Sequence, residues 1–265
     1  MNMNYNYIKC GDCVTLMKDL PNDSIDLTVT SPPYDNLRTY SGFEFDFEAT
    51  AKELYRITKP GGIVVWVVGD ATSKGSESGT SFKQALYFKE IGFNLHDTMI
   101  YEKQGAAFPA TKTSKRYSQI FEYMFVLCKG KIRSDITLLC DKPNKWAGYT
   151  NWGNNTQYDK DGNLIQTNNK KPIPQFSLRN NIWKYVTGFN EKTGHPAVFP
   201  EQLAADHILS WSTEGDIVLD PFVGSGTTAK MAMLNNRNYI GFDISEEYCK
   251  IAKERLEKYS KKEVM

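Results

Sequence analysis

The sequence predicts an α/β fold, an open and mostly parallel sheet with helices on both faces. Short apolar runs alternate with stretches of helical spacing in the first half of the chain and again near its end. The run Ile63–Val68 is apolar throughout, which is typical of a strand covered on both faces. The chain has 265 residues, 40% of them hydrophobic and 24% charged. It is therefore long enough for one large domain, or for a core that carries a smaller insertion.

The first half of the chain is expected to supply most of the sheet. Strands are predicted at residues 7–8, 25–29, 63–68, 95–101 and 120–128, and helices at 14–20, 44–58 and 82–91. The second helix is expected to end at Lys59-Pro60-Gly61-Gly62. Pro32 and Pro33 follow the second strand, and proline cannot donate to a strand ladder. Thr30 to Tyr34 is therefore predicted to be a stiff loop at the carboxyl end of a buried strand, where open α/β sheets bind ligands.

The middle of the chain differs in composition and in charge. From Lys142 to Arg179 it is rich in Asn, Lys, Gln and Thr and poor in aliphatic residues, which predicts an irregular insertion or a small second domain. The net charge of +1 conceals an asymmetry, because the stretch from Lys103 to Pro200 holds 15 Lys and Arg against 6 Asp and Glu. A basic middle favours a polyanionic partner, and a solvated basic loop region is the alternative.

Regular structure is expected to return after His195. The pattern predicts a helix at 201–211, a strand at 217–219, a helix ending near 234, a strand at 239–242 and a last helix at 246–258. Between the first of these strands and the next helix lies DPFVGSGTT, which starts at Asp220. Asp243 ends the following strand, 23 positions after Asp220. Strand, glycine turn, helix, strand and acid is the order of a mononucleotide-binding unit, in which the acid binds a ribose diol.

The glycine spacing separates two kinds of nucleotide cofactor. Only Gly224 and Gly226 are present, and Thr227 follows where a further glycine would help a pyrophosphate to sit on the helix N-terminus. An adenosyl cofactor without phosphates is therefore favoured over NAD. An ordinary tight strand-to-helix turn is the alternative.

The loop TSPPY carries the more specific signal. Ser31 offers a hydroxyl. The carbonyl oxygen of Pro32 is not engaged by its neighbour, because Pro33 has no backbone N–H. These two acceptors suit the two hydrogens of an exocyclic amine, while Tyr34 stacks on the ring that carries it, as base-modifying enzymes require. A proline-stiffened surface turn is the alternative.

Together these motifs resemble those of the amino-group DNA methyltransferases that use S-adenosylmethionine, in the permuted order of the β class. TSPPY near the N-terminus and DPFVGSGTT near the C-terminus carry the resemblance. Further segments that resemble the family are Gly11-Asp12, Arg56 to Gly62, Phe121-Glu122-Tyr123 leading to Lys129, His195-Pro196-Ala197, and Phe199-Pro200-Glu201. The resemblance spans about 7–129 and 194–259 and leaves the basic middle uncovered.

The resemblance implies a Rossmann-like S-adenosylmethionine-dependent methyltransferase sheet with circularly permuted motif order, plus a small target-recognition insertion. It implies that residues 1–130 form the catalytic half with the TSPPY loop and 131–193 the target-recognition region. Residues 194–265 then form the cofactor-binding half and complete the same catalytic domain. The TSPPY loop and the cofactor turn are expected to be neighbours in space.

The resemblance also implies a role for individual residues. Catalysis is expected from Ser31, Pro32, Pro33 and Tyr34. Binding of S-adenosylmethionine is expected from Asp12, Thr30, His195, Pro196, Phe199, Asp220, Pro221, Phe222, Gly224, Gly226, Thr227 and Asp243. DNA contacts are expected from Arg38, Lys112, Lys115, Arg116, Trp152, Lys170, Lys171 and Arg179. No metal is expected, since Cys10-Gly11-Asp12-Cys13 has no second pair at zinc-site spacing.

The predicted function is site-specific transfer of a methyl group from S-adenosylmethionine to the exocyclic amine of a flipped base in double-stranded DNA. In the resembling enzymes Ser before Pro-Pro-Tyr is more typical of N4-cytosine transfer, and Asp or Asn of N6-adenine transfer. Ser31 therefore favours cytosine, with N6-adenine as the alternative. C5-cytosine transfer needs a nucleophilic Cys, and none of the five cysteines follows a proline in a comparable loop.

Two other classes of protein account for less of the sequence. A nicotinamide oxidoreductase leaves TSPPY unexplained, and a catalytically silent DNA-binding module accounts for the basic middle alone. An odd number of cysteines, with no signal peptide and no membrane segment, predicts a cytoplasmic protein. A cognate restriction endonuclease acting on the same site is a candidate partner, and the sequence leaves the oligomeric state open.

Overall fold

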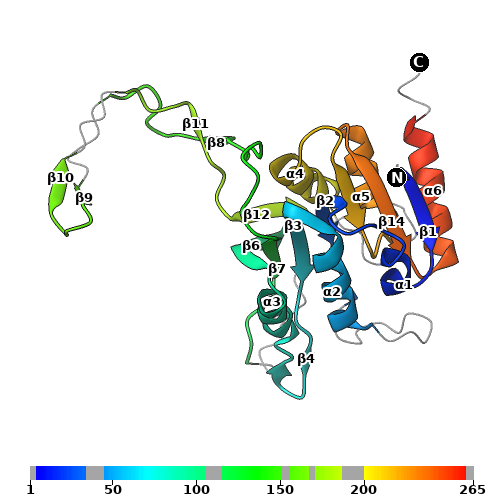
Figure 1. Ribbon diagram of the computed structural model, residues 1–265. Helices are drawn as coiled ribbons and strands as arrows, with labels where there is room; N and C mark the ends of the chain where they lie inside the picture. The colour runs from blue at the N-terminus through cyan, green and yellow to red at the C-terminus, as the bar shows by residue number, and fades with distance from the viewer. Residues whose placement is uncertain are drawn as a thin grey trace. The chain divides into compact units, whose positions relative to one another are not determined.

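The computed structural model describes residues 4–33, 45–104, 115–150, 156–166, 171–186 and 200–260. The chain forms two compact units, one of Met1–Thr137 with Asn181–Met265 and one of Leu138–Asn180. The first unit is built on an eight-stranded sheet of order β1-β14-β13-β2-β3-β7-β6-β12 (Figure 1). Among the described residues, no helix has the length and apolar character needed to cross a membrane.

The sheet draws its strands from both ends of the chain. They are β1 (Tyr7–Cys10), β2 (Ile25–Thr30), β3 (Thr58–Val68), β6 (Asn94–Gln104), β7 (Phe121–Cys128), β12 (Ile182–Val186), β13 (Ile217–Asp220) and β14 (Asn238–Asp243). The first five in spatial order, β1 to β3, pair in parallel, whereas β7 is antiparallel to both β3 and β6. β12 lies at the edge and pairs in parallel with β6. The predicted α/β class is confirmed.

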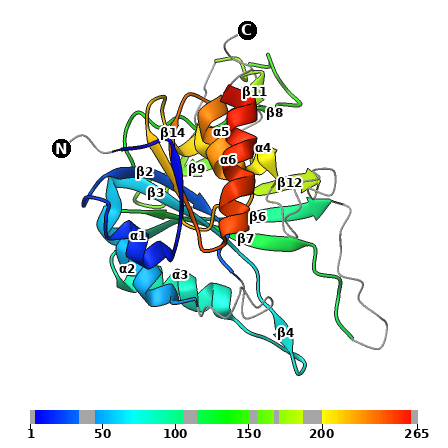
Figure 2. The same cartoon turned by 90° about the vertical axis from the view of Figure 1, so that its right-hand side faces the viewer.

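In the described ranges, six helices cover the two faces of this sheet. They are α1 (Cys13–Met17), α2 (Phe47–Ile57), α3 (Thr80–Glu90), α4 (Glu201–Trp211), α5 (Thr227–Leu234) and α6 (Glu246–Ser260). Apolar side chains of α1, α2 and α3 share one core with Trp66 and Phe242. Those of α4 and α5 share another with Val65 and Trp183, and α6 packs on α5 and β1. Figure 2 shows the first three helices on one face and the last three on the other.

Local sequence explains how the helices begin and end. The Asp12 carboxylate caps α1 by accepting from the Thr15 amide at 2.8 Å, and Asp46 caps α2 in the same way. Arg56 donates to the carbonyl oxygens of Met17, the last residue of α1, and of Leu20, three residues further on. α1 ends earlier than predicted, at Met17 rather than Leu20. The side chain of Arg56 satisfies carbonyls that a continuing helix would otherwise bond.

β3 starts at Thr58, five residues before the predicted start at Ile63. The strand runs through Lys59-Pro60-Gly61-Gly62 because the backbone packs tightly there. A Cβ on Gly62 would lie 2.9 Å from the carbonyl oxygens of Asp26 and Lys59. Glycine therefore lets β2 and β3 approach each other where their register shifts.

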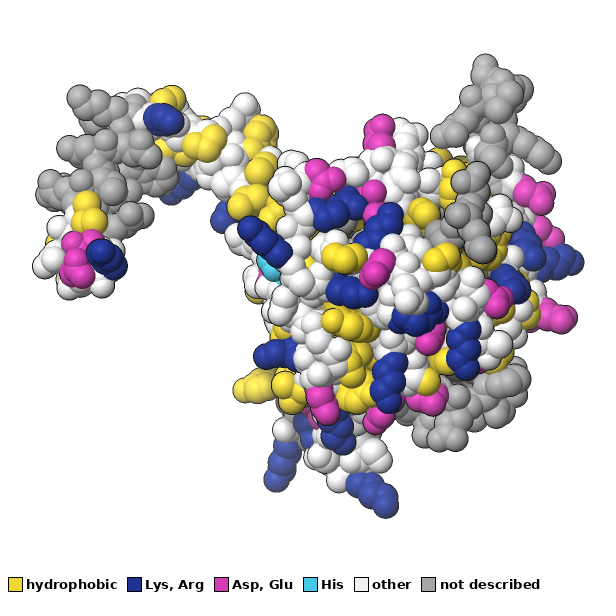
Figure 3. All heavy atoms as spheres, viewed as in Figure 1, with side chains coloured by type: hydrophobic (Ala, Val, Ile, Leu, Met, Phe, Trp, Pro, Cys, Tyr) yellow, Lys and Arg dark blue, Asp and Glu magenta, His cyan; other side chains and the backbone are white. Residues whose placement is uncertain are grey.

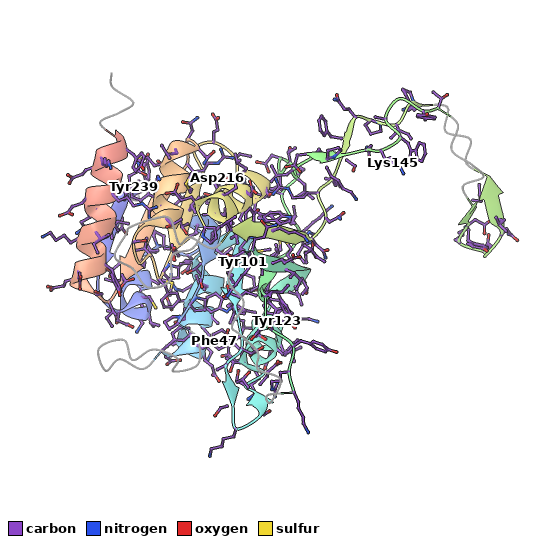
Figure 4. All side chains as sticks on the ribbon, turned by 180° about the vertical axis from the view of Figure 1, so that it is seen from behind. Phe47, Tyr101, Tyr123, Lys145, Asp216 and Tyr239 are labelled. Carbon is purple, nitrogen blue, oxygen red and sulfur yellow. The ribbon has the colours of Figure 1, made fainter. Side chains whose placement is uncertain are left out.

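A buried carboxylate joins three strands at the edge of the sheet where they begin. Asp26 of β2 is 3% exposed and accepts from Lys59 Nζ at 2.7 Å, from Arg133 Nη1 at 2.8 Å and from the Ile217 amide at 2.9 Å. Arg133 also donates to Asp216, at 2.6 Å, just before β13 (Asp216 is labelled in Figure 4). These ion pairs tie the N-terminal strands to the C-terminal ones.

In its described residues, the second unit, Leu138–Asn180, holds two short strand pairings and few buried side chains. Its strands are β8 (Lys142–Pro143), β9 (Thr156–Tyr158), β10 (Leu164–Gln166) and β11 (Phe176–Ser177). The boundaries expected for the target-recognition region, 131 and 193, enclose this unit. They also enclose β12, which belongs to the central sheet because Trp183 pairs with Tyr101 and is buried beneath α4.

Candidate active site

Two strands far apart in the sequence end side by side at the centre of the sheet. β2 pairs in parallel with β13, so that Thr30 and Asp220 leave the sheet at the same edge. The Thr30 hydroxyl donates to Asp220 Oδ1 at 2.7 Å across 190 positions of sequence. The predicted proximity of the TSPPY loop and the cofactor turn is confirmed.

The described part of the catalytic loop starts directly at this bond. Ser31 is half-buried, Pro32 is buried and Pro33 is half-buried. Proline at two successive positions restricts the backbone and removes two amide donors, so Pro32 and Pro33 offer only their carbonyl oxygens as polar groups. Tyr34, predicted to stack on the target base, lies outside the described residues.

The turn after β13 has the backbone geometry that its glycines allow. Gly224 and Gly226 have φ of +48° and +83°, in the left-handed region that side chains other than glycine rarely adopt. The Gly224 amide donates to Asp243 Oδ2 at 2.9 Å, and the Val223 amide donates to the Phe242 carbonyl at 2.8 Å. A Cβ on Gly226 would lie 3.0 Å from the Cβ of Ala252 on α6. The turn is thus held against both β14 and α6.

The third predicted cofactor segment lies beside this turn. Cys10, the last residue of β1, is opposite Asp243 of β14, and the Gly11 amide donates to the Asp243 carbonyl at 2.9 Å. Asp12 is exposed at the start of α1. Asp243 Oδ1 accepts from the Ser245 amide at 2.9 Å, so both of its carboxylate oxygens accept from backbone amides.

The site is acidic, which bears on the kind of cofactor that fits it. Asp220 is buried, and burial raises the pKa of its carboxyl to about 6, with the charge of Asp243 adding to the rise. Two carboxylates at the ends of β13 and β14, which accept from amides of the turn before α5, disfavour a pyrophosphate but suit the cationic sulfonium and ammonium groups of S-adenosylmethionine. The residues present therefore fit that cofactor better than a dinucleotide.

A charged cluster behind the turn was missed by sequence reasoning. Glu201, the first residue of α4, accepts from Lys230 of α5 and from Arg255 of α6, the latter at 2.5 Å. Arg255 also donates to the Thr227 hydroxyl at 3.0 Å and to the Ser225 carbonyl at 3.1 Å. No local pattern pointed to this cluster, because its charged members are 29 and 54 positions from Glu201.

Of the remaining residues predicted to bind the cofactor, the structure describes Pro221 and Phe222. Pro221 is buried and Phe222 is half-buried, with the ring of Phe222 5.2 Å from that of Phe45. The Phe222 amide donates to Asp220 Oδ1 at 3.0 Å. His195, Pro196 and Phe199 lie outside the described residues. The cofactor roles of all these residues stay predictions.

The predicted DNA contacts are spread over both units. Lys115 and Arg116 belong to the first unit, and Lys171 and Arg179 to the second. Arg116 binds the Gly75 carbonyl, and Arg179 pairs with Asp141, so both guanidinium groups have partners within their own unit. Predicted DNA contacts outside the described residues are Arg38, Lys112, Trp152 and Lys170.

The two sulfurs of the CxxC sequence have separate partners. Cys10 Sγ donates to the Ile244 carbonyl at 3.5 Å, and Cys13 Sγ lies 3.7 Å from Thr50 Oγ1. Burial raises the pKa of the Cys13 thiol to about 11. In the part of the chain that the structure describes, no group of three or more His, Cys, Asp or Glu side chains is arranged to hold a metal ion.

The fold and the paired strand ends at this edge of the sheet suit an adenosyl cofactor, and comparisons with known proteins identify the family. The DNA methylase model (N6_N4_Mtase) matches residues 25–254. The orphan methyltransferase M.BamHII of Bacillus amyloliquefaciens is 57% identical over 255 residues, which cover 94% of this chain and 91% of that protein. The chain therefore belongs to the DNA methylase family.

Solved structures agree with this assignment at the level of the fold. PvuII DNA methyltransferase (cytosine-N4-specific) superimposes with a TM-score of 0.69 at 21% identity, over 95% of this chain and 90% of that one. The M1.HpyAVI–SAM complex does so with a TM-score of 0.61 at 24% identity, over 94% and 98%. The protein is an S-adenosylmethionine-dependent DNA methyltransferase of the group that modifies N4 of cytosine or N6 of adenine.

Proposed function

We propose that this enzyme methylates N4 of cytosine at a specific site in double-stranded DNA. The observation that carries the proposal is the serine at the first loop position after β2, beside the Thr30–Asp220 bond. In the enzymes that the motif resembles, serine before Pro-Pro-Tyr is more typical of cytosine-N4 transfer than of adenine-N6 transfer. The PvuII enzyme, which shares the fold, is named as cytosine-N4-specific.

The catalytic loop would orient the target amine by hydrogen bonds. Ser31 Oγ and the Pro32 carbonyl oxygen would each accept one hydrogen of the amine, which draws the nitrogen lone pair out of conjugation with the ring. Tyr34 would hold the flipped base by stacking. S-adenosylmethionine supplies the methyl group when bound, and the alignment of the amine with it supplies much of the acceleration.

The cofactor would lie along the three segments that meet at the edge of the sheet. Asp243 would accept from the ribose hydroxyls, with its position set by the amides of Gly224 and Ser245. Asp12 would lie at the adenine end, and the backbone from Asp220 to Gly226 at the methionine end. His195, Pro196 and Phe199 would close over the methionine.

Sequence recognition is proposed for residues 131–193, the range whose compact part is Leu138–Asn180. In this unit Lys145 lies over the ring of Trp146 at 5.2 Å, and Trp146 contacts Tyr149 (Lys145 is labelled in Figure 4). Exposed aromatic rings beside cations suit contacts with bases and phosphates. The predicted DNA contacts here are Trp152, Lys170, Lys171 and Arg179. We place the enzyme in the cytoplasm with its DNA. A cognate restriction endonuclease acting on the same site is a candidate partner, whereas the relative M.BamHII is named an orphan methyltransferase.

Nucleoside analysis tests the base assignment. Purified protein is incubated with unmethylated genomic DNA and labelled S-adenosylmethionine, and the digested nucleosides are separated by mass spectrometry. N4-methylcytosine is the expected product, and Ser31→Ala is expected to slow its formation roughly tenfold or more, with cofactor binding retained. N6-methyladenine would overturn the base assignment and leave the family unchanged.

A further inference from the structure

A short β-hairpin follows β3, the strand that pairs with β2. β4 (Thr72–Ser73) pairs with β5 (Ser76–Glu77), and the two residues between them, Lys74 and Gly75, both have positive φ, +48° and +79°. This is the backbone of a two-residue type I′ turn, which strongly prefers Asn-Gly or Asp-Gly. Lys74 occupies the first turn position although it is rarely found there, and its side chain is exposed. Backbone strain of this kind is often kept at functional positions, so the left-handed conformation of Lys74 at the hairpin tip points to a binding role for its side chain.

The base of the hairpin is firmly attached to the sheet. Asp70 accepts from the Ser78 hydroxyl at 3.0 Å, from the Ser81 amide at 2.9 Å and from the Ser81 hydroxyl at 2.5 Å. The Ser78 amide also donates to the Ala71 carbonyl at 2.9 Å. These bonds join the end of β3 to the start of α3, so the hairpin projects from a fixed base.

A second segment holds the hairpin from the side. Arg116, which precedes β7, donates to the Gly75 carbonyl, and its Nη1 lies 3.6 Å from Glu77 Oε1. Its neighbour Lys115 is exposed and has a positive φ of +50°. Arg116 thus joins two exposed lysines with left-handed backbone: Lys115 precedes it in the sequence, and Lys74 precedes the Gly75 carbonyl that it binds.

This assembly lies at the edge of the sheet that carries the active site. β3 is the neighbour of β2 in the sheet, and both end at this edge. Tyr123 of β7 is opposite Val68, the last residue of β3, so the segment before β7 reaches the same edge (Tyr123 is labelled in Figure 4). Figure 3 shows Lys and Arg side chains projecting where Figure 1 draws β4.

We propose that the hairpin 72–77 and residues 115–116 form an arm that binds the phosphate backbone of the DNA beside the target base. Lys74 and Lys115 contact phosphates, and Arg116 is a positioning residue that holds the hairpin tip in place. This gives Lys74 a function that the sequence did not indicate, and it changes the role of Arg116 from a direct DNA contact to a support. The proposal rests on the DNA methyltransferase activity but not on the identity of the methylated base.

Salt-dependent DNA binding tests the role of Lys74. A lysine that contacts one phosphate contributes about 1 to the slope of log K against log salt concentration. Lys74→Ala is therefore expected to lower the slope by about 1 and to weaken DNA binding about threefold or more between roughly 50 and 200 mM salt. Lys89→Ala is the matched control, because Lys89 is exposed on the last turn of α3, at the opposite end of that helix. An unchanged slope for Lys74→Ala would overturn the proposal.

A double-mutant cycle tests the role of Arg116. If Arg116 acts by holding the tip, Arg116→Ala already removes the contact of Lys74, and adding Lys74→Ala lowers the slope little further. Additive losses would mean that Arg116 binds a phosphate itself and would refute the positioning role. Thermal melting and S-adenosylmethionine affinity without DNA are expected to match the parent protein. Absence of any methylated nucleoside with the parent protein would refute the proposed function, a result separate from the salt slopes.

Discussion

Asp220 shows how a single residue links the two halves of the site. It is buried, it accepts from Thr30 and from the Phe222 amide, and it lies near the carboxylate of Asp243. Burial raises its pKa to about 6 from the ordinary value of 3.8. The folded protein therefore binds the proton of Asp220 more tightly than the unfolded chain does. The favourable contribution is complete below about pH 4 and is lost as the pH rises through about 6.

Replacing Asp220 with Asn removes this titration and keeps one acceptor oxygen for the same two donors. We expect the free energy of unfolding of Asp220→Asn, relative to the parent, to rise between about pH 4 and pH 7 by up to about 3 kcal/mol. Urea unfolding at a series of pH values measures this difference. If the difference between the two proteins does not change with pH, Asp220 does not titrate in this range.

Sequence reasoning found the residues that belong to one continuous motif and missed those that meet only in three dimensions. Asp220 and Asp243 were assigned because they end successive strands on either side of a glycine turn. Lys230 and Arg255 were missed because the structure alone shows that they meet Glu201. The DNA contact expected of Arg116 stays a prediction, and its bond to the Gly75 carbonyl, 41 positions away, could not be read from the sequence.

At the scale of elements, Asp26 joins β2, β3 and β13 where these strands begin. It is 3% exposed and is surrounded by Lys59, Arg133 and the Ile217 amide. Removing one partner from a buried ion pair leaves charged groups without compensation, which costs more than the pair contributes.

Asp26→Ala is therefore expected to lower the free energy of unfolding by about 3–5 kcal/mol. The matched control is Asp135→Ala, because Asp135 pairs with the same Arg133 at 3.2 Å but is 56% exposed, and its loss should cost about 0–1 kcal/mol. Chemical denaturation measures both. Equal effects of the two substitutions would refute a special role for the buried carboxylate.

The elements that the sequence predicted well are long or strongly apolar. β7 and α4 agree with their predicted bounds to within one residue. β12 was missed, because Ile182–Val186 alternates exposed and buried positions inside a basic, Asn-rich stretch. β3 starts early because Gly62, in a Gly-Gly pair of the kind that commonly ends a helix, here allows β3 to pack closely on β2.

At the scale of the whole molecule, the compact unit Leu138–Asn180 is separate from the unit that carries the site. Replacing this unit with a flexible linker of about ten residues should leave a protein that folds and binds S-adenosylmethionine. Its methylation of DNA at a specific site should be lost, because the proposed recognition contacts are gone. Isothermal titration with the cofactor and sequencing of methylated positions measure the two properties. Retained site specificity would place recognition elsewhere in the chain.

The order of the strands also has a consequence for synthesis on the ribosome. All six residues of β2 are buried, and one of its two neighbours, β13, begins at Ile217, almost 190 residues after the end of β2. The emerging N-terminal segment therefore leaves one edge of this otherwise buried strand unpaired until nearly the whole polypeptide has been translated. Chains that stop before β13 should aggregate or be captured by chaperones, so the nascent protein completes its sheet late and all at once.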